Sequence, residues 1–115
     1  MKILFGTVML VCAAASTAAF AASEDEIMAG YYGNTFYVTD ASGTKHMQYR
    51  ADHTYMEVDQ QGHAVKGTWA IKDDKMCEKP DGGADDCSPI RAGHKAGDSW
   101  TGGGGKKLEI RAGIQ

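Results

Sequence analysis

The stretch from Val65 to Cys77 constrains the fold of this chain more than any other part of the sequence. Along residues 65–72 the side chains alternate between two faces, with Val65, Trp69 and Ile71 on one and Lys66, Thr68, Ala70 and Lys72 on the other. A period of two residues is typical of a β-strand with one buried side. Asp73-Asp74 then predicts a turn, and residues 75–79 return as a second strand. We therefore expect a β-protein organised around this hairpin, with Trp69 buried at its centre.

Two cysteines lie on the same hairpin or shortly after it. Cys77 lies on the returning strand, Cys87 comes ten residues later, and the third cysteine, Cys12, lies in the first 21 residues. An even number of cysteines in an exported chain predicts a disulfide, here Cys77 to Cys87. The nine-residue gap differs from the two-residue gap of redox motifs, so we interpret the pair as structural.

The first 21 residues have the pattern of a secretory signal peptide. Lys2 precedes an apolar run over residues 3–11, and Ala19-Phe20-Ala21 is an A-x-A cleavage signal. The apolar run is shorter than the roughly 20 residues that a spanning helix needs. We predict cleavage after residue 21, a periplasmic or secreted protein, and no membrane association once the signal is removed.

The charge of the remaining chain excludes one class of partner. Residues 22–115 carry 11 Lys and Arg against 15 Asp and Glu, a net charge of −4. A mildly acidic domain lacks the basic surface that binds phosphate backbones, so nucleic acid is not expected as a partner.

The whole pattern predicts an all-β protein. Residues 22–34 form a frayed lead-in with one helical turn after Ser23, and residues 35–115 form a single domain. Turn signals recur about every ten residues, and two turns share the spacing D-x-x-G, at Asp40–Gly43 and Asp59–Gly62. We predict an antiparallel meander of about eight short strands that forms a small barrel or sandwich, over residues 35–39, 44–50, 54–58, 65–72, 75–79, 88–91, 99–101 and 106–112.

The alternation also predicts which side chains face the core. In the strand over residues 54–58 we expect Met56 and Val58 to be buried, and Tyr55 and Glu57 to face water. The complete inward set is Phe36, Val38, Met47, Tyr49, Met56, Val58, Val65, Trp69, Ile71, Met76, Leu108 and Ile110.

Rigid strands and polar loops without a catalytic motif favour a binding or accessory module, with no cofactor. In one version, the mouth of the barrel binds a small apolar or aromatic ligand through Tyr31, Tyr32, Tyr37 and Trp100. In the other, the loop over residues 80–86 docks onto another exported protein, with Pro80, Asp81, Asp85 and Asp86 as the candidate contacts.

Two alternatives remain open from the residues. Imidazole and thioether groups suit copper in an exported protein, and the candidate ligands are His46, His53, Met56 and His63, with Met47 and Met76 as further thioethers. Strand alternation separates His46 from Met47, and the methionines are also good core fillers, so we expect no stoichiometric metal binding. The second alternative is a small hydrolase or isomerase in which Asp52 or Glu57 works with His53 as an acid–base pair.

Several short motifs resemble known proteins. Gly67-Thr68-Trp69 resembles the Gly-x-Trp of lipocalins over three residues, although it lies in the middle of this chain. The longer series resembles small exported β-sheet proteins of Gram-negative bacteria for which no activity is established: Asp52-His53-Thr54-Tyr55, Gly67-Thr68-Trp69, Met76-Cys77, Cys87-Ser88-Pro89 and Gly97-Asp98-Ser99-Trp100. This resemblance implies a β-fold and the periplasm, and no particular function.

Overall fold

The computed structural model of the protein describes residues 22–115. The predicted signal peptide and Cys12 lie outside these residues. One short helix, eight strands and one 3₁₀ turn follow one another along the chain: α1 Glu24–Met28, β1 Thr35–Asp40, β2 Gly43–Tyr49, β3 Thr54–Val58, β4 Ala64–Lys72, β5 Lys75–Pro80, β6 Asp86–Pro89, β7 Ser99–Thr101, η1 Gly103–Gly105 and β8 Lys107–Arg111.

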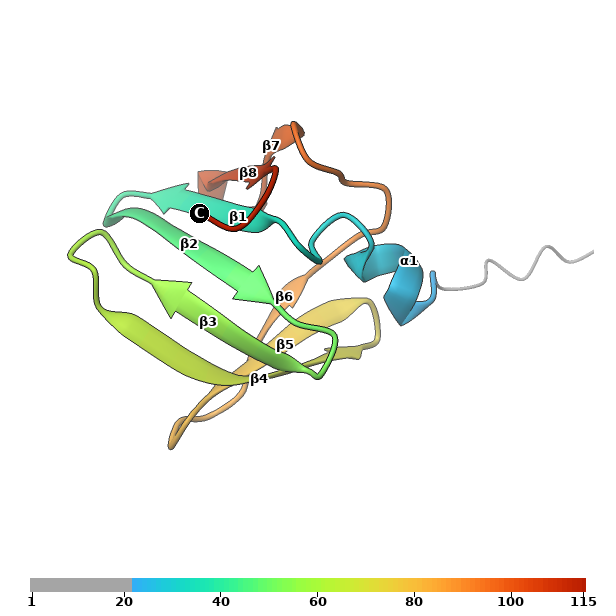
Figure 1. Ribbon diagram of the computed structural model, residues 1–115, viewed down its shortest axis with the longest axis horizontal. Coiled ribbons are helices and arrows are strands. Elements are labelled where there is room, and N and C mark those ends of the chain that lie inside the picture. The colour runs from blue at the N-terminus through green and yellow to red at the C-terminus, as the bar shows by residue number, and fades with distance from the viewer. Residues whose placement is uncertain (1–21) are drawn as a thin grey trace, which may run out of the picture.

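All eight strands belong to one antiparallel sheet, which curls into a half-barrel (Figure 1). The strand order is β6-β5-β4-β3-β2-β1-β8-β7, so the first six strands form the predicted meander and the β7–β8 hairpin extends the sheet beyond β1. Of the two predicted architectures, the barrel-like one is therefore closer than the sandwich. The all-β fold and its number of strands are confirmed.

The turns follow the chemistry that their sequences predict. The Asp40 carboxylate accepts hydrogen bonds from the backbone N–H of Ser42 at 2.8 Å and from its hydroxyl at 2.5 Å. The Asp59 carboxylate accepts two backbone N–H groups, each at 2.9 Å. Gly43 and Gly62 close these turns at φ 124° and 84°, a region that favours glycine. Both D-x-x-G segments are thus hairpin turns that fix the register of the strands around them.

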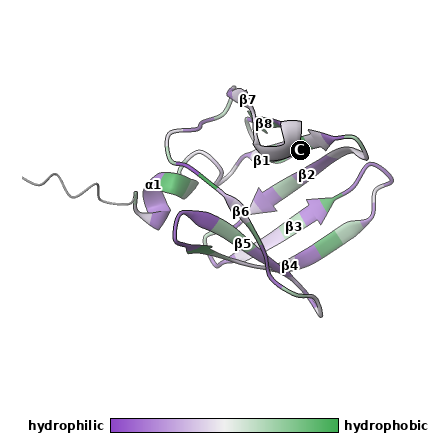
Figure 2. Ribbon diagram, turned by 180° about the vertical axis from the view of Figure 1, so that it is seen from behind, coloured by the Kyte–Doolittle hydropathy of each residue, from purple (hydrophilic) through white to green (hydrophobic). Residues whose placement is uncertain are grey.

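The lead-in is part of the core, contrary to the expectation of a frayed segment. Ser23 caps α1 by accepting a hydrogen bond from the Glu26 N–H at 3.2 Å. Ile27 and Met28 are almost completely buried, and Tyr31, just after the helix, is 3% exposed. Helix α1 covers one end of the half-barrel, and its hydrophobic part is visible in Figure 2. These apolar residues enlarge a core for which the strands alone supply few large side chains.

The predicted phase of β3 is wrong. Tyr55 is 4% exposed, whereas Met56 and Val58 are only half-buried. Tyr55 pairs with both Tyr49 and Gly67, and cross-strand partners share a face, so the register places Tyr55 on the concave side. A carbon atom at the Cβ position of Gly67 would collide with the Lys79 carbonyl oxygen and lie 2.8 Å from the Tyr55 ring. The glycine makes room for that ring.

The other residues predicted to face the core are fully buried, partly buried or, in one case, exposed. Of the other predicted inward residues, Val65 lies opposite Glu57 on the concave side but is 38% exposed near the start of β4. The confirmed members are buried on the concave face: Val38, Met47, Tyr49, Trp69, Met76 and Ile110. Phe36, Ile71 and Leu108 pack against them while partly buried.

Trp69 connects three parts of the molecule. Its side chain is 2% exposed, its indole Nε1–H donates to the Arg50 carbonyl at 2.9 Å, and its backbone N–H donates to the His53 carbonyl at 2.8 Å. The His53 ring stacks on the indole at 4.2 Å between centroids, and His53 Nε2 lies 3.0 Å from Glu24 of α1. Trp69 therefore fixes the β2–β3 turn and the helix against the sheet.

Residues 90–98 connect the two edges of the sheet. Ile90 and Ala96 pack against the core, and the Gly97 N–H donates to the Ile110 carbonyl at 2.8 Å. Ile90 also donates its N–H to the Asp74 carbonyl at 3.1 Å. This segment crosses from β6 to β7 without forming a strand (Figure 1).

Candidate functional site

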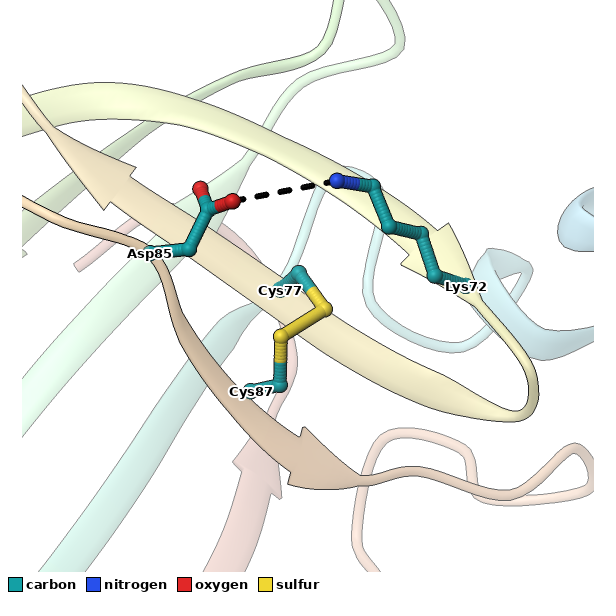
Figure 3. Close-up of a disulfide and its surroundings, with 4 residues drawn as sticks. All are labelled: Lys72, Cys77, Asp85 and Cys87. Atoms are coloured by element: carbon teal, nitrogen blue, oxygen red, sulfur yellow. Dashed lines mark ion pairs between the residues drawn. A yellow bond between two sulfur atoms is a disulfide. The ribbon is translucent and has the colours of Figure 1, made fainter.

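The predicted disulfide joins two neighbouring strands at the end of the sheet. Cys77 on β5 and Cys87 on β6 are direct cross-strand partners, with an S–S distance of 2.08 Å and a Cα–Cα distance of 4.0 Å. Figure 3 shows the bond beside the loop that the two strands enclose. Cys77 is 4% exposed and Cys87 is exposed. The bond therefore closes the base of the β5–β6 hairpin, and its prediction is confirmed.

The tip of this hairpin, residues 80–86, projects from the body of the half-barrel at the bottom of Figure 1. Every residue from Asp81 to Asp86 is exposed. The tip is nevertheless anchored to β4, because the Asp81 N–H donates to the Lys66 carbonyl at 2.9 Å. Within the tip, the Gly83 N–H donates to the Pro80 carbonyl at 2.8 Å and closes a turn. Asp85 also lies 3.8 Å from Lys72 Nζ (Figure 3). The predicted docking residues thus share one anchored, acidic projection.

A polar cluster lies behind the hairpin on the concave face. Glu78, on β5, accepts a hydrogen bond from the Tyr49 hydroxyl at 2.5 Å, and Lys45 forms an ion pair with Glu57 at 2.9 Å. These four side chains come from β2, β3 and β5. In the sheet register Glu78 also lies opposite Asp86 at the end of the tip. The cluster therefore links the base of the hairpin to the central strands.

Burial and neighbouring charge shift the ionisation of this cluster. Burial raises the pKa of Glu78, and although the Tyr49 hydrogen bond lowers it, the charge of Glu57 raises it again. Burial, with the Glu78 charge, also raises the pKa of Tyr49 well above its usual value and that of Tyr55 to about 12. Burial lowers the pKa of Lys45, but the hydrogen bond and charge of Glu57 outweigh it and the net shift is upward. Tyr49 thus remains a hydrogen-bond donor at neutral pH.

These shifts predict the pH dependence of a Glu78→Gln variant. A carboxyl whose pKa is higher in the folded state contributes stability below its ordinary value of 4.5, and this contribution is lost as the pH rises through the folded pKa. Glutamine keeps an acceptor for Tyr49 and has no charge. We expect Glu78→Gln to gain stability relative to the parent protein between pH 4 and pH 7, measured by urea unfolding at several pH values. Glu26→Gln, which removes an exposed carboxylate, is the control; an equal gain there would refute the assignment to Glu78.

This cluster could not be predicted from the sequence, for a physical reason. Tyr49 and Glu78 are 29 residues apart, and their contact depends on the curl of the sheet. The register that places Tyr55 inward also places Glu57 inward, although the polar character of Glu57 predicted the opposite. A charged residue at an inward position of the alternating pattern is the only signal that the sequence contains, and recognising it requires the correct phase.

The four aromatic candidates do not line one mouth. Tyr31 lies in the core with edge contacts to Phe36 and Tyr49, and Tyr32 packs near Trp69. Trp100 stacks on Phe36 and on His94, the latter at 3.6 Å between centroids. The structure places these three at the end of the half-barrel that α1 covers. Tyr37 lies on the convex face.

A shallow recess of about 430 Å³ does bring Tyr37 and Trp100 together. Arg111 lies over the Tyr37 ring at 4.0 Å and donates two hydrogen bonds to Glu109 at 3.1 and 3.2 Å. The rest of the lining is largely hydroxylated or charged: Thr39, Thr44, Ser99, Thr101, Lys107 and Leu108. This lining suits a polar ligand better than an apolar one.

The histidines and methionines of the copper alternative occupy different environments. His46 lies on the convex face beside Tyr37, while Met47 and Met76 are buried on the concave face. His53 stacks on Trp69, His63 lies 3.3 Å from Asp59 in a turn, and Met56 lies on the convex face of β3. Within residues 22–115, no three His, Cys, Asp or Glu side chains are grouped as metal ligands.

The acid–base candidates hold turns and strands together. The Asp52 carboxylate accepts hydrogen bonds from the Thr54 N–H at 3.0 Å and from its hydroxyl at 2.6 Å, and these bonds lower its pKa. His53 is engaged with Trp69 and Glu24, and Glu57 with Lys45. The arrangement gives each of these groups a structural partner.

Comparison of the chain with protein-family models, with curated proteins and with solved structures found no match. Among the helices of residues 22–115, none has the length and apolar character needed to cross a membrane.

Proposed function

We propose that this protein is an exported accessory module, working in the periplasm or outside the cell, that docks onto another exported protein through the tip of the β5–β6 hairpin. The observation that carries this proposal is the contrast between tip and base. Residues 81–86 are all exposed, while the disulfide, the strand ladder and the Tyr49–Glu78 hydrogen bond hold the base. An ordered loop loses little conformational entropy when it binds, so this construction favours affinity.

The charge of the tip specifies the kind of surface that it fits. Asp81, Asp85 and Asp86 are exposed, and the Lys72–Asp85 pair at 3.8 Å is an exposed, screened contact. A basic patch on the partner would complement these carboxylates and accelerate association. The disulfide is compatible with an oxidising compartment, which supports export.

A second candidate function is the binding of a small polar ligand in the convex-face recess beside Tyr37. Its volume of about 430 Å³ lies within the range of ligand pockets. It is open, however, and Arg111 already covers the Tyr37 ring. The hairpin therefore supports the docking function better.

Site-specific photocrosslinking tests the docking function. A photoreactive residue replaces Ala84 at the tip, or Ala41 in the β1–β2 turn as a control that is also exposed. We expect a discrete adduct from position 84 and none from position 41 after illumination of intact cells. The triple change Asp81→Asn, Asp85→Asn and Asp86→Asn is expected to weaken the adduct because it removes the complementary charge. Equal adducts at both positions, or none at position 84, would contradict the proposal.

A further inference from the structure

The strand next to the tip ends the sheet. Within residues 22–115, β6 pairs with β5 and with no other strand. All four of its residues are exposed. At the other end of the sheet, the edge strand β7 has three residues and its Trp100 is covered by His94. An exposed strand edge presents unpaired backbone groups that another chain can bind, so β6 is the more accessible of the two edges.

The geometry of the disulfide shows where those backbone groups point. In an antiparallel pair, residues whose Cα atoms lie close together, near 4.5 Å, form the non-hydrogen-bonded type of pair. The Cα atoms of Cys77 and Cys87 are 4.0 Å apart, so this pair is of that type. The N–H and C=O of Cys87 therefore point away from β5 toward the open edge. Asp86 and Ser88, on either side, direct their backbone groups toward β5.

The charge beside the open edge of β6 indicates which kind of segment pairs with it. The open edge continues into Asp85 and Asp86, and residues 22–115 carry a net charge of −4. A second copy that paired antiparallel with β6 would bring another net-negative chain to this edge, and its own β6 has no Lys or Arg to complement these carboxylates. An extended basic segment instead pairs its backbone with Cys87 and places its Lys or Arg side chains beside Asp85 and Asp86.

We propose that β6 accepts an extended basic segment of the partner as a further antiparallel strand. This inference rests on the proposed docking function and names the chemistry of the partner for the same hairpin. Strand addition supplies affinity through backbone hydrogen bonds, and the side chains supply specificity. The short edge offers only a few hydrogen bonds, so the acidic tip is needed to select the strand that binds.

Amide exchange with model peptides tests the inference. The probe is the blocked peptide Lys-Val-Lys-Val-Lys, and the two controls are Glu-Val-Glu-Val-Glu and the basic peptide methylated on its backbone nitrogens. With nine-tenths of the protein bound to the basic peptide, we expect the Cys87 amide to exchange about ten-fold more slowly, because only the free fraction exchanges. Neither control is expected to protect this amide.

Variants separate the inference from the docking function. Asp85→Asn with Asp86→Asn is expected to weaken binding of the basic peptide, whereas Asp25→Asn with Glu26→Gln, which removes two exposed charges from α1, is not. Equal binding of the methylated peptide, or protection elsewhere with no change at Cys87, would overturn strand addition. A position-84 adduct in cells together with such a result would leave the docking function standing and refute only the β6 inference.

Discussion

Replacing Trp69 with alanine is expected to destabilise the protein by about 3–5 kcal/mol, the usual loss for a buried tryptophan. The side chain is 2% exposed and packs between the β2–β3 turn and the aromatic core. Small domains have total stabilities of about 5–15 kcal/mol, so this substitution removes a large fraction of the free energy of unfolding. Urea unfolding monitored by far-UV circular dichroism measures the loss.

A second variant separates packing from hydrogen bonding at this position. Trp69→Phe keeps an aromatic ring but removes the indole donor to the Arg50 carbonyl. The Arg50 carbonyl still accepts the His53 N–H at 3.0 Å, so loss of the indole bond alone is expected to cost about 0.5–1.5 kcal/mol, less than the alanine variant. If Trp69→Ala cost less than about 1 kcal/mol, the central place of Trp69 in the core would be refuted.

The strands and turns were largely predictable because their signals are local. Alternation and D-x-x-G turns depend on neighbouring residues, and the hairpin around Trp69 follows from them. Alternation with a period of two, however, does not indicate which of the two alternating groups of side chains is buried. Tyr55 illustrates this: the sequence pattern favoured Met56 and Val58, and only the pairing of Tyr55 with Tyr49 and Gly67 decides its face.

Only part of the candidate site could be predicted from the sequence. Cysteine spacing predicts the disulfide, and the composition of residues 80–86 predicts an exposed acidic loop. The Tyr49–Glu78 and Lys45–Glu57 contacts join residues from different strands, so they require the curl of the sheet. The burial of α1 was also not predicted, because a helix of five residues is too short for its sequence to indicate what it packs against.

Removal of the disulfide has the second largest expected effect. The double change Cys77→Ser and Cys87→Ser opens a loop with a sequence separation of 10 residues. The entropic model predicts a loss of roughly 2–3 kcal/mol for so short a loop. Urea unfolding of the variant and of the oxidised parent protein measures this difference. A loss confined to the hairpin should leave the near-UV signal of the aromatic core, which includes Trp69, unchanged.

The same change should free the tip before it unfolds the core. Residues 81–86 are all exposed, so the β5–β6 ladder and the anchoring bond from Asp81 become their main restraints. A looser tip must lose more conformational entropy on binding. Full stability in the absence of the disulfide would show that the bond does not brace the hairpin.

The docking function is tested most directly by the photocrosslinking yield at position 84 with and without the disulfide. The yield is normalised to the amount of folded protein, with position 41 as the reference in each background. We predict a strong adduct at position 84 in the disulfide-bonded protein and a marked loss of that adduct in the Cys77→Ser, Cys87→Ser variant. An adduct of equal yield in both proteins would contradict docking through a braced hairpin.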